Sequence, residues 1–185
     1  NPTINYQIGD IERIPVLNMD KTTENVVIQQ VDHAISLSKH DWDQQEESWD
    51  YRMPSVIQYE GSNIEQSLNT WLRDLQSRYS SMKNIEQNLN DIFNRLYGLD
   101  RTEDSIESPI SIKLPESHET AIFAVNSLLS YFVGCIFGRY SLDKLGLVYA
   151  GGDWNGSAYT SFKPNQDNLI LLTDRDYFGD ERDII

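Results

Sequence analysis

Apolar residues recur at every seventh position through the middle of the chain, between about residues 62 and 97. The repeat consists of five long aliphatic side chains, Leu68, Leu75, Met82, Leu89 and Leu96. Other apolar residues beside them widen the stripe. This spacing predicts a long amphipathic helix, which at 1.5 Å per residue would extend for roughly 50 Å. Gly98 is the expected stop, because glycine readily adopts the left-handed conformation that closes a helix.

A helix with so long an apolar face needs a partner, and residues 23–40 are the nearest candidate. Val27, Val31 and Ala34 recur there at intervals of three or four residues, as on one face of a helix. Thr22 or Thr23 is positioned to cap its first turn. The pattern therefore predicts two packed helices.

The apolar segment from about residue 118 to 139 has a different character. Its apolar residues lie nearly all round the predicted helix, which indicates burial on several sides. Ser117 is a candidate cap for its start. Gly134 and Gly138 fall on one face and would allow another backbone to approach, although ordinary core packing is the favoured interpretation.

The same segment raises the question of a membrane. Its apolar part, residues 121–138, barely reaches the roughly 20 residues that a span requires. Asn126, Ser127 and Ser130 interrupt it. A buried helix is therefore favoured over a membrane span.

Short apolar runs predict a small β element. Residues 110–114 alternate like a strand, and residues 147–152 and 169–172 could pair as a short antiparallel hairpin. The predicted fold is mainly α with this small β element. We expect an initial segment over residues 1–20, a helical spacer over 21–108, and a helix with a β subdomain over 109–185.

Charge and composition narrow the possible functions. Twenty-nine acidic and 15 basic residues give the 185-residue chain a net charge of −14, which argues against independent binding to nucleic acid. A hydrophobic fraction of 39% is too high for a wholly disordered chain. The first residue is not methionine, so we expect a piece of a larger protein.

Residues that could carry chemistry are few. His33 and His40 lie seven residues apart, which leaves metal binding less favoured than a solvated surface. The acids of residues 41–50 could bind a cation or act as an acid–base pair, but a charged face between packed tryptophans is the simpler interpretation.

Three other features fit structural roles better than chemical ones. Cys135 stands among aromatic residues and is interpreted as a buried small hydrophobe rather than a nucleophile. The glycine-rich segment 151–156 lacks the Lys-Ser/Thr of a phosphate loop and favours a turn. The acids of residues 174–180 match a calcium loop poorly. The sequence therefore predicts no catalytic, cofactor-binding or metal-binding residue in this chain.

Several stretches resemble one family, the large adenine-specific DNA methyltransferases of BREX phage-defence systems (PglX-like), and more loosely the type IIG restriction-modification enzymes. They occur in family order along nearly the whole chain: NPTINYQIGDI (1–11), DWD (41–43), SWDY (48–51), LNDIFNRLYGL (89–99), SYFVGCIFGRYSLD (130–143), YAGG (149–152) and TDRDYF (173–178).

The resemblance implies a parent enzyme that transfers a methyl group from S-adenosylmethionine to adenine N6 in DNA, after the base is flipped out of the stack. The family's catalytic Asn/Asp-Pro-Pro-Tyr motif is absent, and Asn1-Pro2 matches only two of its residues. The chain thus resembles the region downstream of the catalytic domain, where related enzymes carry long spacer helices.

The leading hypothesis is a non-catalytic spacer, or connector, that positions target recognition relative to the catalytic core of a cytoplasmic methyltransferase. DNA would be contacted through the parent enzyme, and no membrane is expected. The alternative is a protein-interaction module that binds other defence-system proteins through the acidic residues 20–60. The long apolar stripe could also support a homodimer if its neighbours are missing.

Overall fold

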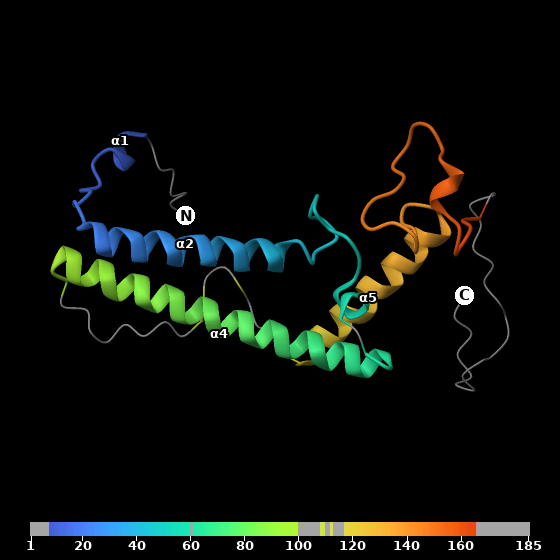
Figure 1. Cartoon of the computed structure of the whole chain (residues 1–185), viewed down its shortest axis with the longest axis horizontal. Coiled ribbons are helices and arrows are strands. Elements are labelled where there is room, and N and C mark those ends of the chain that lie inside the picture. The colour runs from blue at the N-terminus through green and yellow to red at the C-terminus, as the bar shows by residue number, and fades with distance from the viewer. Residues whose placement is uncertain (1–7, 60, 100–107, 110–111, 113–116, 166–185) are drawn as a thin grey trace, which may run out of the picture. The chain divides into compact units, whose positions relative to one another are not determined.

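The computed structural model describes residues 8–59, 61–99, 108–109, 112 and 117–165. It is mainly helical (Figure 1), which confirms the predicted class. The elements are α1 (Ile8–Ile11), α2 (Lys21–Trp42), α3 (Ser55–Gln58), α4 (Ile64–Tyr97), α5 (Ser117–Ile136) and a 3₁₀ turn, η1 (Gly156–Ala158).

The chain forms two compact units, and each is built from segments that are separate in the sequence. Unit 1 comprises residues 1–40 and 74–114, and unit 2 comprises residues 41–73 and 115–185. The long helix α4 belongs to both, because its residues before Asp74 are part of unit 2 and the others are part of unit 1.

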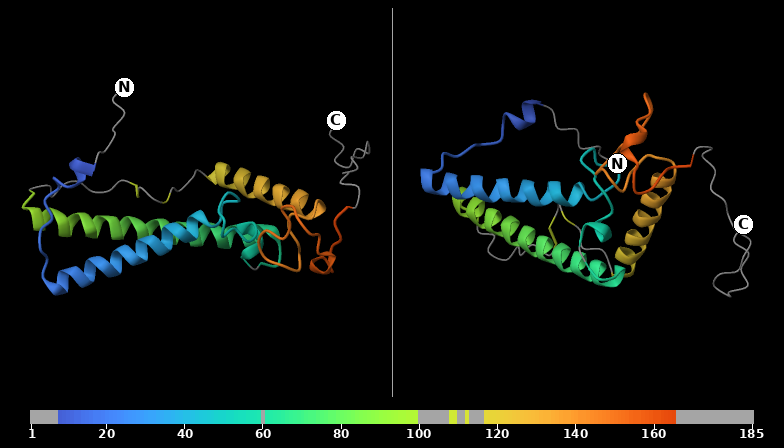
Figure 2. Two further views of the ribbon diagram at one scale, coloured as in Figure 1. Left: turned by 90° about the horizontal axis from the view of Figure 1, so that it is seen from above. Right: turned by 45° about the vertical axis from the view of Figure 1, so that its right-hand side comes forward.

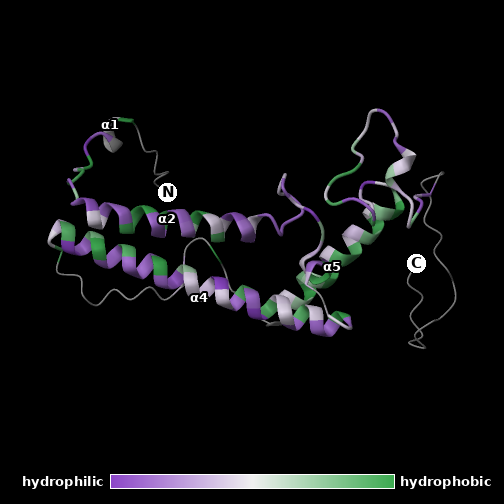
Figure 3. Ribbon diagram, in the orientation of Figure 1, coloured by the Kyte–Doolittle hydropathy of each residue, from purple (hydrophilic) through white to green (hydrophobic). Residues whose placement is uncertain are grey.

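In unit 1 the apolar stripe of α4 packs against α2, as predicted. Leu75 and Met82 are buried together with Ile112, and Ala34 and Leu37 of α2 cover this cluster. Figure 1 shows the first part of α2 above the last part of α4, and the left-hand view of Figure 2, from above, shows that the two helices diverge toward this end. Colouring by hydropathy shows the apolar residues of α4 as an interrupted green stripe (Figure 3).

In unit 1, a side chain caps the start of α2 and a glycine closes the end of α4. Asp20 caps α2, since its carboxylate accepts hydrogen bonds from the backbone N–H groups of Thr22 and Thr23. The prediction that one of these threonines caps the helix is therefore wrong. At the C-terminal end of α4, Gly98 has a φ of 62°. It is the residue that the sequence predicts as the end of this helix. The backbone N–H of Leu99 donates to the carbonyl of Asn94, which completes a Schellman motif.

In unit 2, α5 is partly buried and ends at Ile136, three residues before the predicted limit. Val56 of α3, Trp71 of α4 and Ala124 of α5 form one buried cluster, and Tyr131 and Cys135 of α5 belong to a second. The prediction of burial on several sides of α5 is wrong, because one side of the helix is buried and large apolar residues on the rest are exposed.

The two glycines near the end of α5 leave room for aromatic rings rather than for another backbone. A Cβ atom on Gly134 would collide with the ring of Tyr140. Gly138 has a φ of 76°, and a Cβ atom there would lie 2.7 Å from the ring of Trp154. The favoured interpretation, core packing, agrees with these contacts.

The predicted hairpin is not confirmed. Within the described part of the chain no residue forms a strand, and residues 147–150 are irregular. The second arm, residues 169–172, lies outside the described residues, as does the predicted strand 110–114 apart from Ile112.

Candidate interaction site around Glu46

The acidic segment after α2 folds into consecutive tight turns. Backbone N–H groups of Gln44, Gln45, Ser48 and Tyr51 each donate to the carbonyl three residues earlier. The Ser48 hydroxyl donates to the Asp43 carboxylate at 2.7 Å and accepts from the backbone N–H of Asp50 at 3.2 Å. Such local bonds between side chains and the backbone favour turns over helix, so α2 ends here.

Gln44 anchors these turns in the interior of unit 2. It is buried, and its Oε1 atom accepts from Trp71 Nε1 at 2.9 Å and from the Ser55 hydroxyl at 3.0 Å. The indole nitrogen can only donate, so this geometry fixes which amide atom faces it. One buried glutamine thereby joins the acidic segment to both α3 and α4.

Glu46, two residues later, is the centre of a second polar cluster. Its carboxylate accepts from the Ser130 hydroxyl of α5 at 2.6 Å and from the Tyr140 hydroxyl at 2.8 Å. The Arg139 guanidinium lies 3.7 Å from the same carboxylate and 5.5 Å from the centre of the Tyr140 ring. Hydrogen bonds to an ionised acceptor are stronger than neutral ones, so Glu46 fixes the segment after α5.

Three tyrosines line the apolar side of this cluster. The rings of Tyr131 and Tyr140 are stacked at 5.1 Å, and Tyr51 meets Tyr140 edge-on at 5.9 Å. Burial raises the pKa of Tyr51 and of Tyr131 to about 12. Burial also raises the pKa of Tyr140, and the hydrogen bond to Glu46 adds to that shift. At neutral pH all three are uncharged phenols, which can donate hydrogen bonds but cannot act as bases.

A cavity of about 350 Å³ opens beside the cluster. Leu129, Val133 and Phe137 of the α5 region give it an apolar wall, and Glu46 and Arg139 give it a charged edge. The Glu46 carboxylate at this edge accepts the two hydrogen bonds described above, and the apolar wall is suited to holding an apolar group.

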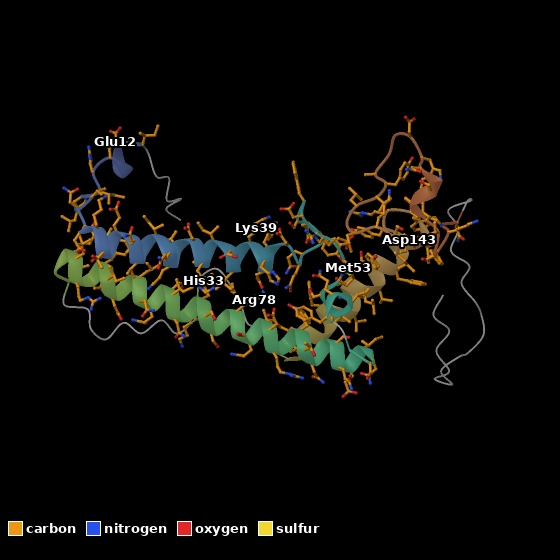
Figure 4. All side chains as sticks on the ribbon, in the orientation of Figure 1. Glu12, His33, Lys39, Met53, Arg78 and Asp143 are labelled. Atoms are coloured by element: carbon orange, nitrogen blue, oxygen red, sulfur yellow. The ribbon has the colours of Figure 1, made fainter. Side chains whose placement is uncertain are left out.

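Of the candidate residues from the sequence, Glu46 is one of the acids of residues 41–50, whereas the two histidines are not among the residues of this cluster. His33 is exposed on α2, the helix on which Figure 4 labels it, and His40 is exposed seven residues later. Within the described residues no three His, Cys, Asp or Glu side chains gather as metal ligands would. Cys135 is buried, and burial raises the pKa of its thiol, in agreement with the predicted packing role.

The glycine-rich segment forms turns, as the sequence favours. Gly151 and Gly152 have φ values of 114° and 86°, and Asn155 caps the short η1 turn. Further along, the Asp143 carboxylate accepts hydrogen bonds from the backbone of Thr160 and Ser161 and from the Ser161 hydroxyl, which lower the pKa of Asp143. Asp143 therefore holds this loop (Figure 4). The acids of residues 174–180 lie outside the described residues.

Sequence reasoning did not predict Glu46 as the centre of a cluster, and it misjudged the tryptophans beside it. Trp49 is fully exposed and Trp42 is 57% exposed, so the predicted packing of tryptophans between the acids is wrong. One signal pointed to the cluster. Glu46 stands between the stretches 41–43 and 48–51, and Arg139 and Tyr140 lie in the stretch 130–143. These three stretches are among those that resemble one family.

Among the described residues, one helix is long and apolar enough to cross a membrane, over Glu119–Ile136 of α5. The core helices of many soluble proteins satisfy the same criterion. A third of this window is buried within the protein, where Ala124 and Tyr131 face other elements of unit 2. Along this side α5 therefore packs against the rest of unit 2.

Comparison with known proteins places the whole chain beside two methyltransferases. It is 36% identical over 195 residues to the adenine-specific methyltransferase PglX of Lacticaseibacillus casei (strain Zhang), covering 100% of the chain and 15% of that protein. It is 31% identical over 200 residues to the adenine-specific methyltransferase BrxX of Escherichia coli O9:H4 (strain HS), covering 97% of the chain and 16% of that protein.

No family model matches the chain. By the coverage given above, the chain spans about one sixth of the length of these two relatives. The resemblance to a segment of the PglX-like methyltransferases is confirmed.

Proposed function

We propose that this chain, homologous over its whole length to a segment of adenine-specific methyltransferases, is a non-catalytic connector of such an enzyme. The observation that carries the proposal is the 36% identity that extends over all of the chain but only 15% of the relative. The parent enzyme would methylate adenine N6 in DNA for a phage-defence system in the cytoplasm. The connector would position target recognition relative to the catalytic core.

The chemistry of the described residues supports a non-catalytic role. The Cys135 thiol is buried with a raised pKa, and the buried tyrosines are neutral. The Glu46 carboxylate holds Ser130 and Tyr140, and the Asp143 carboxylate holds a loop. These groups contact the protein's own backbone and side chains, which supports a structural role for each of them.

Three places in the described part of the chain where a cofactor or DNA could bind do not fit either ligand. The glycine-rich turns around Gly151 are exposed, and the carboxylate beside the 350 Å³ cavity already has two donors. The N-terminus of α2, where an anion could bind, is occupied by the carboxylate of Asp20. With a charge of −14, the chain would also repel phosphates. We therefore assign cofactor and DNA contacts to the remainder of the parent enzyme.

The helix α4 is the element best suited to a spacing role. Its 34 residues form a continuous helix of about 51 Å. The Asn63 side chain caps its start by accepting from the backbone N–H of Gln66, and Gly98 closes its end. Both ends are thus defined by local bonds, as a spacer of fixed length requires.

The non-catalytic role is tested in the full-length enzyme with Glu46→Gln, Cys135→Ala and Asp143→Asn. A group that takes part in proton transfer contributes about 10²–10⁴-fold to the rate. We expect each variant to keep its turnover number for methyl transfer within about threefold of the original enzyme. A loss of a hundredfold or more in a variant that still binds S-adenosylmethionine would show a catalytic contribution.

The spacing role is tested by a kink in α4. Asn84 is exposed near the middle of the helix, and Asn84→Pro removes a backbone hydrogen bond there at a cost of about 3 kcal/mol, whereas Asn84→Ala keeps the helix. We expect the proline variant to bind S-adenosylmethionine normally but to lose methylation of the target sequence, and the alanine variant to keep both. Normal target methylation by the proline variant would rule out the spacing role.

A second candidate function, protein interaction, is favoured by the tryptophans. Trp49 is fully exposed and lies between the exposed acids Glu47 and Asp50. Exposed tryptophans are frequent anchors of protein interfaces, and the surrounding acids favour a basic partner. Trp49→Ser in the full-length enzyme should abolish capture of a purified defence-system protein while leaving methylation intact. Equal capture by both enzymes would reject this function.

A further inference from the structure

The exposed side of α5 carries an uninterrupted apolar stripe. Ile122, Val125, Leu129 and Phe132 are each 55–58% exposed, and Val133 beside them is 38% exposed. Their spacing of three and four residues places them along one line of the helix, over about 15 Å. Single exposed apolar residues are common, but a continuous apolar stripe on a helix marks a surface that packs against something.

The opposite side of α5 is packed against other parts of unit 2, so the orientation of the exposed stripe is fixed. Thr120, Ala124 and Tyr131 are buried there against unit 2. The Schellman motif at Gly138, with the N–H of Arg139 donating to the carbonyl of Gly134 at 2.8 Å, fixes where α5 ends. The helix is therefore held in one orientation, with one apolar face inward and a second outward.

We propose that the stripe Ile122–Phe132 is an intramolecular interface, covered by an apolar helix face from the part of the methyltransferase that lies outside these 185 residues. This proposal rests on the proposed function, because it requires a longer parent chain. The relatives supply the argument for the occupant. The matched segment is only 15–16% of the length of these relatives. Most of the chain that could supply a helix to cover the stripe therefore lies outside the segment.

The composition of α5 favours a protein occupant over lipid or solvent. The residues between the stripe positions include Asn126 and Ser130, which are exposed and polar. Ser130 donates to Glu46, and Arg139 lies at the end of the stripe. An apolar line with polar residues beside it and an ion pair at one end is the composition of a helix–helix interface with a polar rim. The cavity walled by Leu129, Val133 and Phe137 would accept one side chain of the partner helix.

The test uses the full-length methyltransferase with p-benzoylphenylalanine in place of Phe132. This photo-crosslinker resembles phenylalanine and reacts with C–H bonds within reach. The control variant carries it at Leu142, which is 61% exposed in unit 2 but is not part of the stripe. On irradiation we expect the variant at position 132 to give at least about tenfold more crosslinked product than the control, because only a covered side chain has a fixed neighbour. The product should have the mass of one chain and join position 132 to a peptide outside the 185 residues.

Every other result would overturn the proposal. A product of twice the mass would identify a second copy as the occupant, and adducts formed only with added lipid vesicles would identify a membrane. A crosslink within residues 1–185, or a yield equal to that of the Leu142 control, would show that no other region covers the stripe.

Assay of DNA methylation on the same preparations separates this inference from the proposed function. Methylation without the expected crosslink refutes only the interface. The crosslink without methylation refutes only the assignment to a DNA methyltransferase.

Discussion

Replacing Gly134 with alanine tests the fit between α5 and Tyr140. In the interior of a helix this substitution normally stabilises by about 1 kcal/mol, because glycine is the poorer helix former. Here the added methyl group would lie 2.8 Å from Cε2 of the Tyr140 ring and closer still to Cδ2. The ring cannot move freely, since it stacks on Tyr131 and its hydroxyl donates to Glu46. The packing contact and the helix propensity therefore act in opposite directions.

The magnitudes decide which effect prevails. Forcing one extra carbon into a filled space costs about 1–3 kcal/mol. A shift of the ring would also weaken a hydrogen bond to a carboxylate, of a kind that contributes about 1.5–3 kcal/mol. Against the gain of about 1 kcal/mol in helix propensity, we expect Gly134→Ala to lower the free energy of unfolding by about 1.5–5 kcal/mol.

Urea denaturation followed by far-UV circular dichroism measures this change, provided that the slope with urea stays constant. Gly9→Ala is the matched control, because Gly9 lies within α1 and nothing stands within 4 Å of its added methyl group. A second control repeats Gly134→Ala in a Tyr140→Ala background, where the obstruction is gone and the sign should reverse. The reasoning is refuted if Gly134→Ala stabilises the original chain, or if it has the same effect in both backgrounds.

Three further predictions follow from the same contacts. Gly98→Ala should lower the free energy of unfolding by about 1–2 kcal/mol in urea denaturation, because a φ of 62° is unfavourable for alanine, and Gly98→Asn should cost less. Stability should fall as the pH rises from 10 to about 12, because Tyr51 and Tyr131 keep their protons in the folded chain at pH values where the unfolded chain has released them. Thermal melts across this range measure the change. A melting temperature that does not fall would contradict the prediction. Asp143→Ala should speed hydrogen exchange at the amide of Ser161, while exchange within α4 stays unchanged.

The helices could be predicted from the sequence because their signals are local. The seven-residue repeat and Gly98 defined α4 to within two residues, since apolar spacing and a left-handed glycine act within a single helix. The cap of α2 was misassigned by two or three residues because Asp20, Thr22 and Thr23 are all good capping residues, and only the backbone geometry selects among them.

The cluster around Glu46 could not be predicted, because its members come from distant parts of the chain. Glu46 and Tyr140 are 94 residues apart, and no periodic pattern links a carboxylate in a turn to a phenol after a helix. The burial of α5 was overestimated for a related reason. A helix that is apolar all round is consistent both with complete burial by its own domain and with a face reserved for another surface.

The interleaving of the two units sets the order in which a ribosome can complete them. Unit 1 needs residues 74–114 to cover the helix made from residues 21–40, so that helix emerges 74 residues before its unit is finished. At the usual pace of translation, about 5–20 residues per second, this interval lasts roughly 4–15 s. Throughout it Ala34 and Leu37, which later pack on α4, lack their partners, and Val26, Ile28 and Ile35 are exposed even in the finished unit. For several seconds the nascent chain therefore contains an amphipathic helix without its partner helix. We expect chaperones at the ribosomal exit to bind its apolar face during this time.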